Sequence, residues 1–219
     1  MKRWLRKHIY VVFLLPGLVL YTLFMVYPLG SALGFSLFAW DGLLRGAFQG
    51  LENFRTVLFQ APYNIRFWNA FKHNTIFFAI TFFIQTTLGL FLAVLFTRKR
   101  KGYDLLQTLF FVPYTLSMVI VGFLWLLLLN PTWGAFNKGL KAMGLGSWAQ
   151  PWLGQTNTAL LTVIFVNAWR WLGFPILVFK AGLQGISEEY HEAARVDGAT
   201  GWQMFRNITL PLVLPTIGM

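Results

Sequence analysis

The stretch Asn74–Lys101, NTIFFAITFFIQTTLGLFLAVLFTRKRK, decides what kind of fold this chain can adopt. Its first part, Asn74 to Thr97, carries no formal charge, and its last four residues are all basic. A helix needs about 20 apolar residues to cross the hydrocarbon core of a bilayer. Basic residues next to such a run mark the cytoplasmic side. The stretch therefore predicts a transmembrane helix that ends in the cytoplasm.

The composition of the whole chain agrees with a membrane protein. Of the 219 residues, 57% are hydrophobic and only 11% are charged, and the mean hydropathy is +0.58. A soluble domain carries about 25% charged residues. The 23 phenylalanines and 10 tryptophans suit lipid-facing helices with anchors at the membrane interfaces. The chain has no cysteine, which excludes disulfides and thiolate metal sites.

Four further apolar runs complete the predicted organisation. Ile9–Trp40 is free of charge and longer than a crossing requires, and we expect Pro16 and Pro28 to kink it. The predicted fold class is all-α, a polytopic transmembrane helical bundle with four full spans plus the start of a fifth. We expect a single transmembrane domain, residues 1–219, with spans at about 9–36, 74–97, 105–129 and 158–181, a cytoplasmic loop at 182–211, and an incomplete span at 212–219.

The basic residues predict the orientation. Eight of the 18 basic residues lie in two clusters beside apolar runs, namely Lys2, Arg3, Arg6 and Lys7, and then Arg98–Lys101. The loops 41–73 and 130–155 hold basic residues at lower density, so we expect them outside and the N-terminus in the cytoplasm. The net charge of +11 therefore indicates contact with membrane lipid and not with nucleic acid. The first run is too long for a cleavable secretion signal, so we expect it to be retained.

An acidic segment follows the fourth predicted span. Four of the seven acidic residues lie between Glu188 and Asp197. Ser187 can cap a helix there, and Gly198 is a natural stop. We expect a second short helix from Thr200 or Gly201 to about Asn207, after which Pro211 lets the chain turn into the next membrane helix. A merely solvated loop is the alternative, but apolar residues such as Tyr190, Val196 and Trp202 favour a loop that contacts a partner.

The same segment resembles a known family. Residues 192–211 fit the pattern EAA-x3-G-x9-I-x-LP, which looks like the EAA loop of ATP-binding-cassette (ABC) importer permeases. The matching and flanking residues that the resemblance assigns to ATPase coupling are Glu192, Ala193, Ala194, Asp197, Gly198, Ile208, Leu210 and Pro211. Upstream, GLENFRTVL, LFFVPY and WRWLGFPILVFKAGLQGIS are similar to the first permease subunit of maltose, glycerol-3-phosphate and multiple-sugar importers.

The resemblance implies a permease for a sugar or sugar-like solute in a bacterial or archaeal inner membrane. It would form half of the translocation pathway and pair with a second permease subunit, a cytoplasmic ABC ATPase dimer and an extracytoplasmic solute-binding protein. Such permeases usually have six core helices, with two after the EAA loop. This sequence stops eight residues after Pro211, so the resemblance also implies a C-terminally truncated chain.

Polar residues inside the predicted spans are candidates for the substrate pathway, because such residues are costly in a membrane. They are Gln85, Thr115, Ser117, Asn167 and Arg170. Hydroxyl side chains can instead bond their own helix, and Arg170 can instead hold two helices together. No Asp or Glu lies inside a predicted span, which disfavours the alternative of an ion-coupled secondary transporter. A truncated, non-functional permease remnant is a further alternative.

The sequence predicts no catalysis by this chain. No lysine is followed by Ser or Thr, so a nucleotide-binding P-loop is absent and ATP hydrolysis must belong to a partner. His191–Arg195 begins like a zinc-binding HExxH motif, but Arg195 stands at the second ligand position. We therefore expect neither a metal nor a cofactor.

Overall fold

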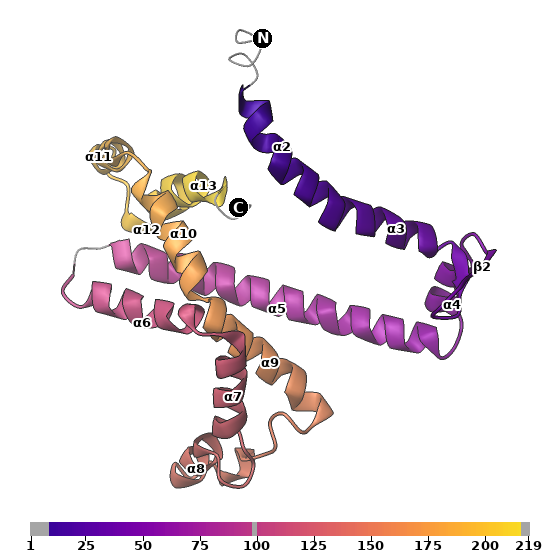
Figure 1. Ribbon diagram of the computed structural model, residues 1–219. Helices are drawn as coiled ribbons and strands as arrows, with labels where there is room; N and C mark the ends of the chain where they lie inside the picture. Colours follow the sequence, from indigo (N-terminus) through magenta and orange to yellow (C-terminus); the bar gives the residue numbers. More distant parts are fainter. Residues whose placement is uncertain (1–8, 98–99, 216–219) are drawn as a thin grey trace. The chain divides into compact units, whose positions relative to one another are not determined.

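The computed structural model describes residues 9–97 and 100–215, and most of these residues are helical (Figure 1). The predicted all-α transmembrane fold class is confirmed, with one short β-hairpin added. Several sequence features lie outside the described residues: the N-terminal basic cluster, Arg98 and Lys99 of the second cluster, and residues 216–219 of the incomplete span. The chain divides into two compact units, residues 1–72 and 73–219.

The first unit begins with a continuous apolar helix of 27 residues. It consists of α2 (Ile9–Tyr21), the π-helical turn η1 (Thr22–Val26) and α3 (Tyr27–Phe35). The π turn ends two residues before Pro28, and the N–H of Tyr27 bonds to the carbonyl of Thr22. A proline ring clashes with the carbonyl four residues before it, so a wider turn lets the helix continue.

A β-hairpin follows this helix and was not predicted. Its strands, β1 (Phe38–Trp40) and β2 (Arg45–Phe48), are antiparallel. Asp41 forms the turn, because its Oδ1 accepts hydrogen bonds from the N–H groups of Leu43 at 3.0 Å and Leu44 at 2.7 Å. These two hydrogen bonds also lower the pKa of Asp41.

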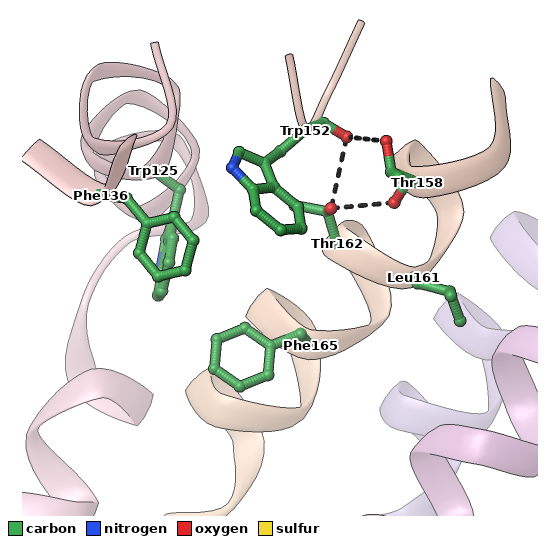
Figure 2. A pocket seen from close by; sticks show the side chains of 7 residues that line it. All are labelled: Trp125, Phe136, Trp152, Thr158, Leu161, Thr162 and Phe165. Atoms are coloured by element: carbon green, nitrogen blue, oxygen red, sulfur yellow. Dashed lines mark hydrogen bonds between the residues drawn. The ribbon is translucent and has the colours of Figure 1, made fainter. Parts of the chain in front are cut away.

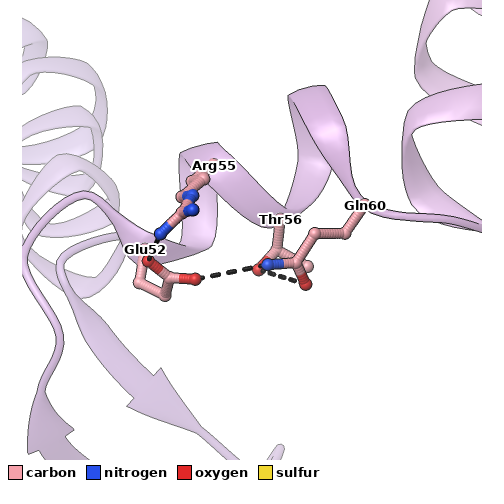
Figure 3. Close-up of polar contacts among 4 residues, drawn as sticks. All are labelled: Glu52, Arg55, Thr56 and Gln60. Carbon is pink, nitrogen blue, oxygen red and sulfur yellow. Dashed lines mark hydrogen bonds and ion pairs between the residues drawn. The ribbon is translucent and has the colours of Figure 1, made fainter.

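Helix α4 (Glu52–Phe59) closes the hairpin segment. The side chain of Asn53 donates to two backbone carbonyls of the preceding segment, each at 2.9 Å. Figure 3 shows the exposed polar contacts of α4, in which Glu52 pairs with Arg55 at 3.7 Å and accepts from Gln60 at 3.3 Å. Exposed pairs of this kind contribute little to stability, so Asn53 is the residue that fixes this segment.

Helix α5 (Tyr63–Thr97) contains the second predicted span, and its part from His73 onward opens the second unit. The elements that follow it are α6 (Tyr103–Thr115), α7 (Met118–Leu128), α8 (Ala135–Ala142), the 3-10 turn η2 (Gly146–Trp148), α9 (Thr156–Trp171), α10 (Gly173–Gln184), α11 (Glu188–Val196), α12 (Gly201–Met204), the π turn η3 (Phe205–Thr209) and α13 (Leu210–Val213).

The third and fourth predicted spans are bent. The axes of α6 and α7 differ by 101°, and those of α9 and α10 by 43°. The second bend has a clear cause, because Pro175 cannot donate a hydrogen bond to the preceding turn. Within the described residues, two helices are long and apolar enough to cross a membrane unbent, and up to four spans have the required length and composition if each bent pair is one span. Four full spans therefore stay a prediction.

The buried core of the second unit is small and centres on α10. One cluster holds Ala93, Phe179 and Val213, and a second holds Phe96, Leu172 and Ile176. Most other large apolar side chains in the described residues are exposed. Water would make so much exposed apolar surface unfavourable, whereas lipid tails and neighbouring subunits accept it.

Candidate functional site

The acidic segment folds as a helix with a defined start and stop. Ser187 caps α11, since its Oγ accepts from the N–H of Glu189 at 3.4 Å. Gly198 has a φ of +76° at the other end. The N–H of Gly198 bonds to the carbonyl of Arg195 at 3.1 Å, and that of Ala199 to the carbonyl of Ala194 at 2.9 Å. These two bonds form a Schellman motif, which fixes the direction in which the chain leaves α11.

The second helix of the segment starts where the sequence indicated but ends later. Thr200 and Gln203 form a capping box at the start of α12. We expected this helix to end near Asn207 and Pro211 to turn the chain, and that expectation was wrong. The helix continues through η3 to Val213, and the N–H of Leu210 bonds to the carbonyl of Phe205. The π turn makes room for the proline ring, as at Pro28.

The carboxyl end of the segment is fastened to the membrane helices. Val213 is fully buried and packs with Phe179 of α10 and Ala93 of α5. Thr209 is also buried, and the predicted residues Ile208 and Leu210 beside it are half-buried. Pro211 is exposed. We call α11, α12 and the turn between them, residues 188–204, the elbow. The elbow therefore connects at one end to α10 and at the other to the buried cluster of α5 and α10.

The elbow presents an acidic and apolar surface. Glu192, Ala193 and Asp197 are exposed, and Val196 and Trp202 expose 87% and 67% of their surface. Ala194 is only 8% exposed, so its small side chain serves packing inside this chain. Glu188 pairs with Arg195 at 2.9 Å. Within the described residues Glu189, Glu192 and Asp197 form no ion pair, which leaves three negative charges open to a basic partner.

Three of the five polar candidates in the spans meet at the break between α6 and α7. Arg170 of α9 donates from Nη2 to the backbone carbonyl of Leu116 at 3.1 Å. Thr115 donates to the carbonyl of Val112 in its own helix at 2.8 Å, and Ser117 is exposed at the start of α7. The other two candidates, Gln85 and Asn167, are half-buried on α5 and α9 and take no part in this contact.

An aromatic pocket of about 290 Å³ lies between α7, α8 and α9. Figure 2 shows the side chains that line it, which are Trp125, Phe136, Trp152, Thr158, Leu161, Thr162 and Phe165. The hydroxyls of Thr158 and Thr162 donate to the carbonyl of Trp152 at 3.0 and 3.3 Å, so they are already engaged. The pocket therefore offers mainly apolar contacts. The described residues hold no group of three acidic or histidine side chains that could bind a metal.

A comparison with known protein families decides what kind of protein this is. Residues 85–218 match the family of binding-protein-dependent transport system inner membrane components. The match covers both bent helix pairs and the elbow. This chain belongs to that family.

Curated relatives of the permease extend the similarity toward its N-terminus. The probable ABC transporter permease protein YurN of Bacillus subtilis is 36% identical over 94% of this chain and 70% of the relative. The probable starch degradation products transport system permease protein AmyD of Thermoanaerobacterium thermosulfurigenes is 30% identical over 94% of this chain and 68% of its own length. The sn-glycerol-3-phosphate transport system permease protein UgpA of Agrobacterium fabrum is 34% identical over 92% of this chain and 67% of its own length.

A solved structure agrees with these relatives. The bacterial alginate ABC transporter, determined in complex with an alginate pentasaccharide-bound periplasmic protein, contains a chain that matches 99% of the permease at a TM-score of 0.79 and 26% identity. The match covers 71% of that chain. The permease is accordingly a multi-pass inner membrane protein and a component of a transport system. The alternative of an ion-coupled secondary transporter is not supported.

Sequence reasoning missed several residues that organise the permease. The aromatic pocket was not foreseen, because its tryptophans were interpreted as ordinary interfacial anchors. Asn137 is 3% exposed and links the pocket to its loop, since it donates to the carbonyl of Gln150 at 3.0 Å and accepts from the indole of Trp152 at 2.8 Å. No sequence pattern pointed to the pocket or to Asn137. For the bend between α9 and α10 there was a usable signal, because Gly173 and Pro175 stand inside an apolar run.

Proposed function

We propose that this permease forms half of the translocation pathway of an ABC importer for a sugar or sugar-like solute. Its relatives include permeases named for starch degradation products and for sn-glycerol-3-phosphate, and a structural neighbour is named for alginate. The solutes in these three names all carry several hydroxyl groups. The second half of the pathway comes from another permease subunit, and an extracytoplasmic solute-binding protein delivers the solute.

The elbow of α11 and α12 couples the permease to a cytoplasmic ABC ATPase dimer. The supporting observation is an exposed acidic and apolar surface on a segment whose start, stop and far end are all fixed by hydrogen bonds or burial. A fixed segment moves as a rigid body when its partner moves. Closure of the ATPase dimer around nucleotide displaces α11, and this displacement reaches the membrane helices through α10 and α13.

Individual residues of the elbow have different tasks in this proposal. Glu192 makes a charge-assisted contact with a basic residue of the ATPase. Ala193 allows the ATPase to approach the helix closely, and Asp197 adds negative charge at the elbow. Gly198 sets the direction of the chain. Residues Ile208, Leu210 and Pro211 hold the elbow to its helices.

Polar residues of α5 and of the two bent spans face the solute pathway. Gln85 of α5, together with Asn167 and Ser117 of the bent spans, offers side-chain hydrogen bonds, whereas Thr115 already bonds its own helix. Discontinuous membrane helices commonly form transport sites near the middle of the bilayer. The bends at α6–α7 and α9–α10 provide such helices.

Charge reversal at Glu192 tests the coupling. In cells that produce this chain with its partner permease, ATPase and binding protein, we expect Glu192→Lys to lower solute uptake at least about tenfold, because a favourable charge contact becomes repulsive. Membrane insertion and basal ATP hydrolysis should persist. Glu52→Lys, which makes the same charge change on exposed α4, is the matched control and should retain uptake.

Crosslinking provides an independent measurement. The chain has no cysteine, so Ala193→Cys introduces a single thiol at an exposed position of α11. We expect it to crosslink to the ATPase subunit, and Leu43→Cys at the exposed hairpin turn not to do so. Normal uptake by a Glu192→Lys, Gly198→Pro double variant would refute the coupling role. Absence of uptake by the unsubstituted assembly would instead support the non-functional remnant.

A further inference from the structure

The break between α6 and α7 leaves a backbone group that needs a partner. Leu116 and Ser117 are extended, with ψ of 144° and 141°, between two helices whose axes differ by 101°. A carbonyl that loses its helical partner inside a membrane is costly unless another group satisfies it. The guanidinium of Arg170 does so, since Nη2 donates to the carbonyl of Leu116 at 3.1 Å.

Arg170 lies next to the second bend. It is the penultimate residue of α9, at the middle of the bent pair Thr156–Gln184. Its guanidinium lies 5.1 Å from the ring centre of Trp171, and its Nε is buried without a hydrogen-bond partner among the described residues. No acidic side chain in the described ranges forms an ion pair with it. A charged side chain inside a membrane span is energetically costly. The hydrogen bond to the carbonyl of Leu116 offsets part of this cost.

Two further contacts fasten the end of α6 to the α9–α10 bend. The ring of Tyr114 lies 5.3 Å from that of Trp171 and 5.8 Å from that of Phe174. At Gly173 the backbones approach so closely that an added Cβ would lie 2.8 Å from the carbonyl oxygen of Phe110. The two bends are therefore packed against each other and are not separate features.

We propose that the α6–α7 break and the α9–α10 bend form one joint, in which Arg170 ties the freed carbonyl of Leu116 to α9. Movement of α10 then turns α7. Arg170 is a positioning residue in this joint and not a solute contact. The consequence for transport rests on the proposed function, because α10 leads directly into α11. The existence of the joint does not depend on it.

The spacing between α6 and α7 tests the joint without any transport measurement. Cysteines at the exposed positions Leu105 and Leu126 carry spin labels in the otherwise cysteine-free chain. A straight helix would separate these positions by about 32 Å at 1.5 Å per residue, and the bend makes the separation shorter. We expect a short, narrow distance distribution in the unsubstituted chain. Arg170→Met removes the donor, so the distribution should broaden toward the longer value.

A matched variant distinguishes loss of the Arg170–Leu116 hydrogen bond from loss of a positive charge in general. Lys180 of α10 donates to the side chain of Gln107 in α6 at 2.5 Å. Lys180→Met therefore removes one cation and one hydrogen bond between α10 and α6, next to the α9–α6 contact of Arg170. No backbone carbonyl at a break loses its partner. We expect Lys180→Met to leave the spacing unchanged. Arg170→Lys and Arg170→Gln each retain a donor and should restore most of the short spacing.

Uptake by the assembled importer tests the consequence for transport. We expect Arg170→Met to lower the maximal uptake rate about tenfold, which corresponds to about 1.4 kcal/mol, with the half-saturating solute concentration unchanged. Arg170→Gln should recover the rate, since it donates without a charge. An unchanged spacing in Arg170→Met would overturn the joint, whatever the uptake. Altered spacing with normal uptake would overturn its role in transport. Failure of both Arg170→Lys and Arg170→Gln to recover the short spacing would overturn the hydrogen bond to Leu116 as the tie.

Discussion

At the scale of single residues, the absence of a side chain is as decisive as its presence. Gly173 places α10 against α6, because an added Cβ would lie 2.8 Å from the carbonyl oxygen of Phe110 and from the Cα of Phe111. These are backbone atoms, which cannot move aside by changing a rotamer. Gly122 of α7 has nothing within 4 Å of the position where a Cβ would stand.

The two glycines predict opposite effects of the same substitution. Gly173→Ala should destabilise the solubilised permease by about 1–3 kcal/mol, because it overpacks a close helix contact. Gly122→Ala should stabilise it by up to about 1 kcal/mol, since alanine loses less entropy than glycine in a helix. Thermal unfolding in detergent measures both. Equal midpoint temperatures for the two variants would contradict the close contact at Gly173.

At the scale of elements, local hydrogen bonds define the elbow more than burial does. The α11 helix has nine residues, and the helix that begins with α12 runs on through η3 only to Val213, so both are too short to be more than marginally stable alone. The cap at Ser187, the Schellman motif at Gly198 and the capping box at Thr200 satisfy the free backbone groups at their ends. The elbow therefore keeps its form with few buried side chains.

Removal of one cap should loosen the elbow. Thr200→Ala deletes the side chain that accepts from the N–H of Gln203. We expect a loss of about 1 kcal/mol, so amides of residues 201–204 should exchange hydrogen about fivefold faster. Thr108→Ala is the control, because the Thr108 hydroxyl only donates to the carbonyl of Asp104 within its own helix. Unchanged exchange at 201–204 would show that tertiary packing, and not the cap, holds α12.

At the scale of the whole molecule, the orientation in the membrane follows from charge. The two basic clusters of the sequence predict that the N-terminus and the loop after Thr97 lie in the cytoplasm. By the same count we expect the hairpin turn at Leu43 outside and the acidic elbow inside. The proposed coupling requires this arrangement, because ATP is available only in the cytoplasm.

Single cysteines test the orientation directly. Leu43 and Val196 expose 88% and 87% of their surface, so both positions are accessible to a reagent. We expect a membrane-impermeant maleimide to label Leu43→Cys in intact cells and to label Val196→Cys only after the membrane is opened. The matched exposure of the two sites makes their reactivity comparable. Labelling of Val196→Cys in intact cells would place the elbow outside and remove the basis of ATPase coupling.

Patterns within a short window of sequence were sufficient for much of this protein. Uninterrupted apolar runs of about 20 residues indicated a transmembrane helical fold, since a helix satisfies its backbone hydrogen bonds within one segment in lipid. The cap at Ser187 and the stop at Gly198 were also correct, because a helix end depends on residues only a few positions away. The end of the second helix was placed wrongly near Asn207, with a turn at Pro211, since a proline can continue a helix when a π turn precedes it.

The sequence by itself determined the fold class, the family and the ends of α11, because hydropathy, spacing and caps are local properties. Only the tertiary structure decided where the spans bend and what holds each bend. Arg170 and Leu116 are 54 residues apart, and no periodicity connects them. Their contact exists because α6 meets α9 at Tyr114 and α10 at Gly173. The free carbonyl at a helix break can accept a hydrogen bond from any donor that tertiary packing brings near it. Such packing depends on several distant segments and cannot be predicted from one of them.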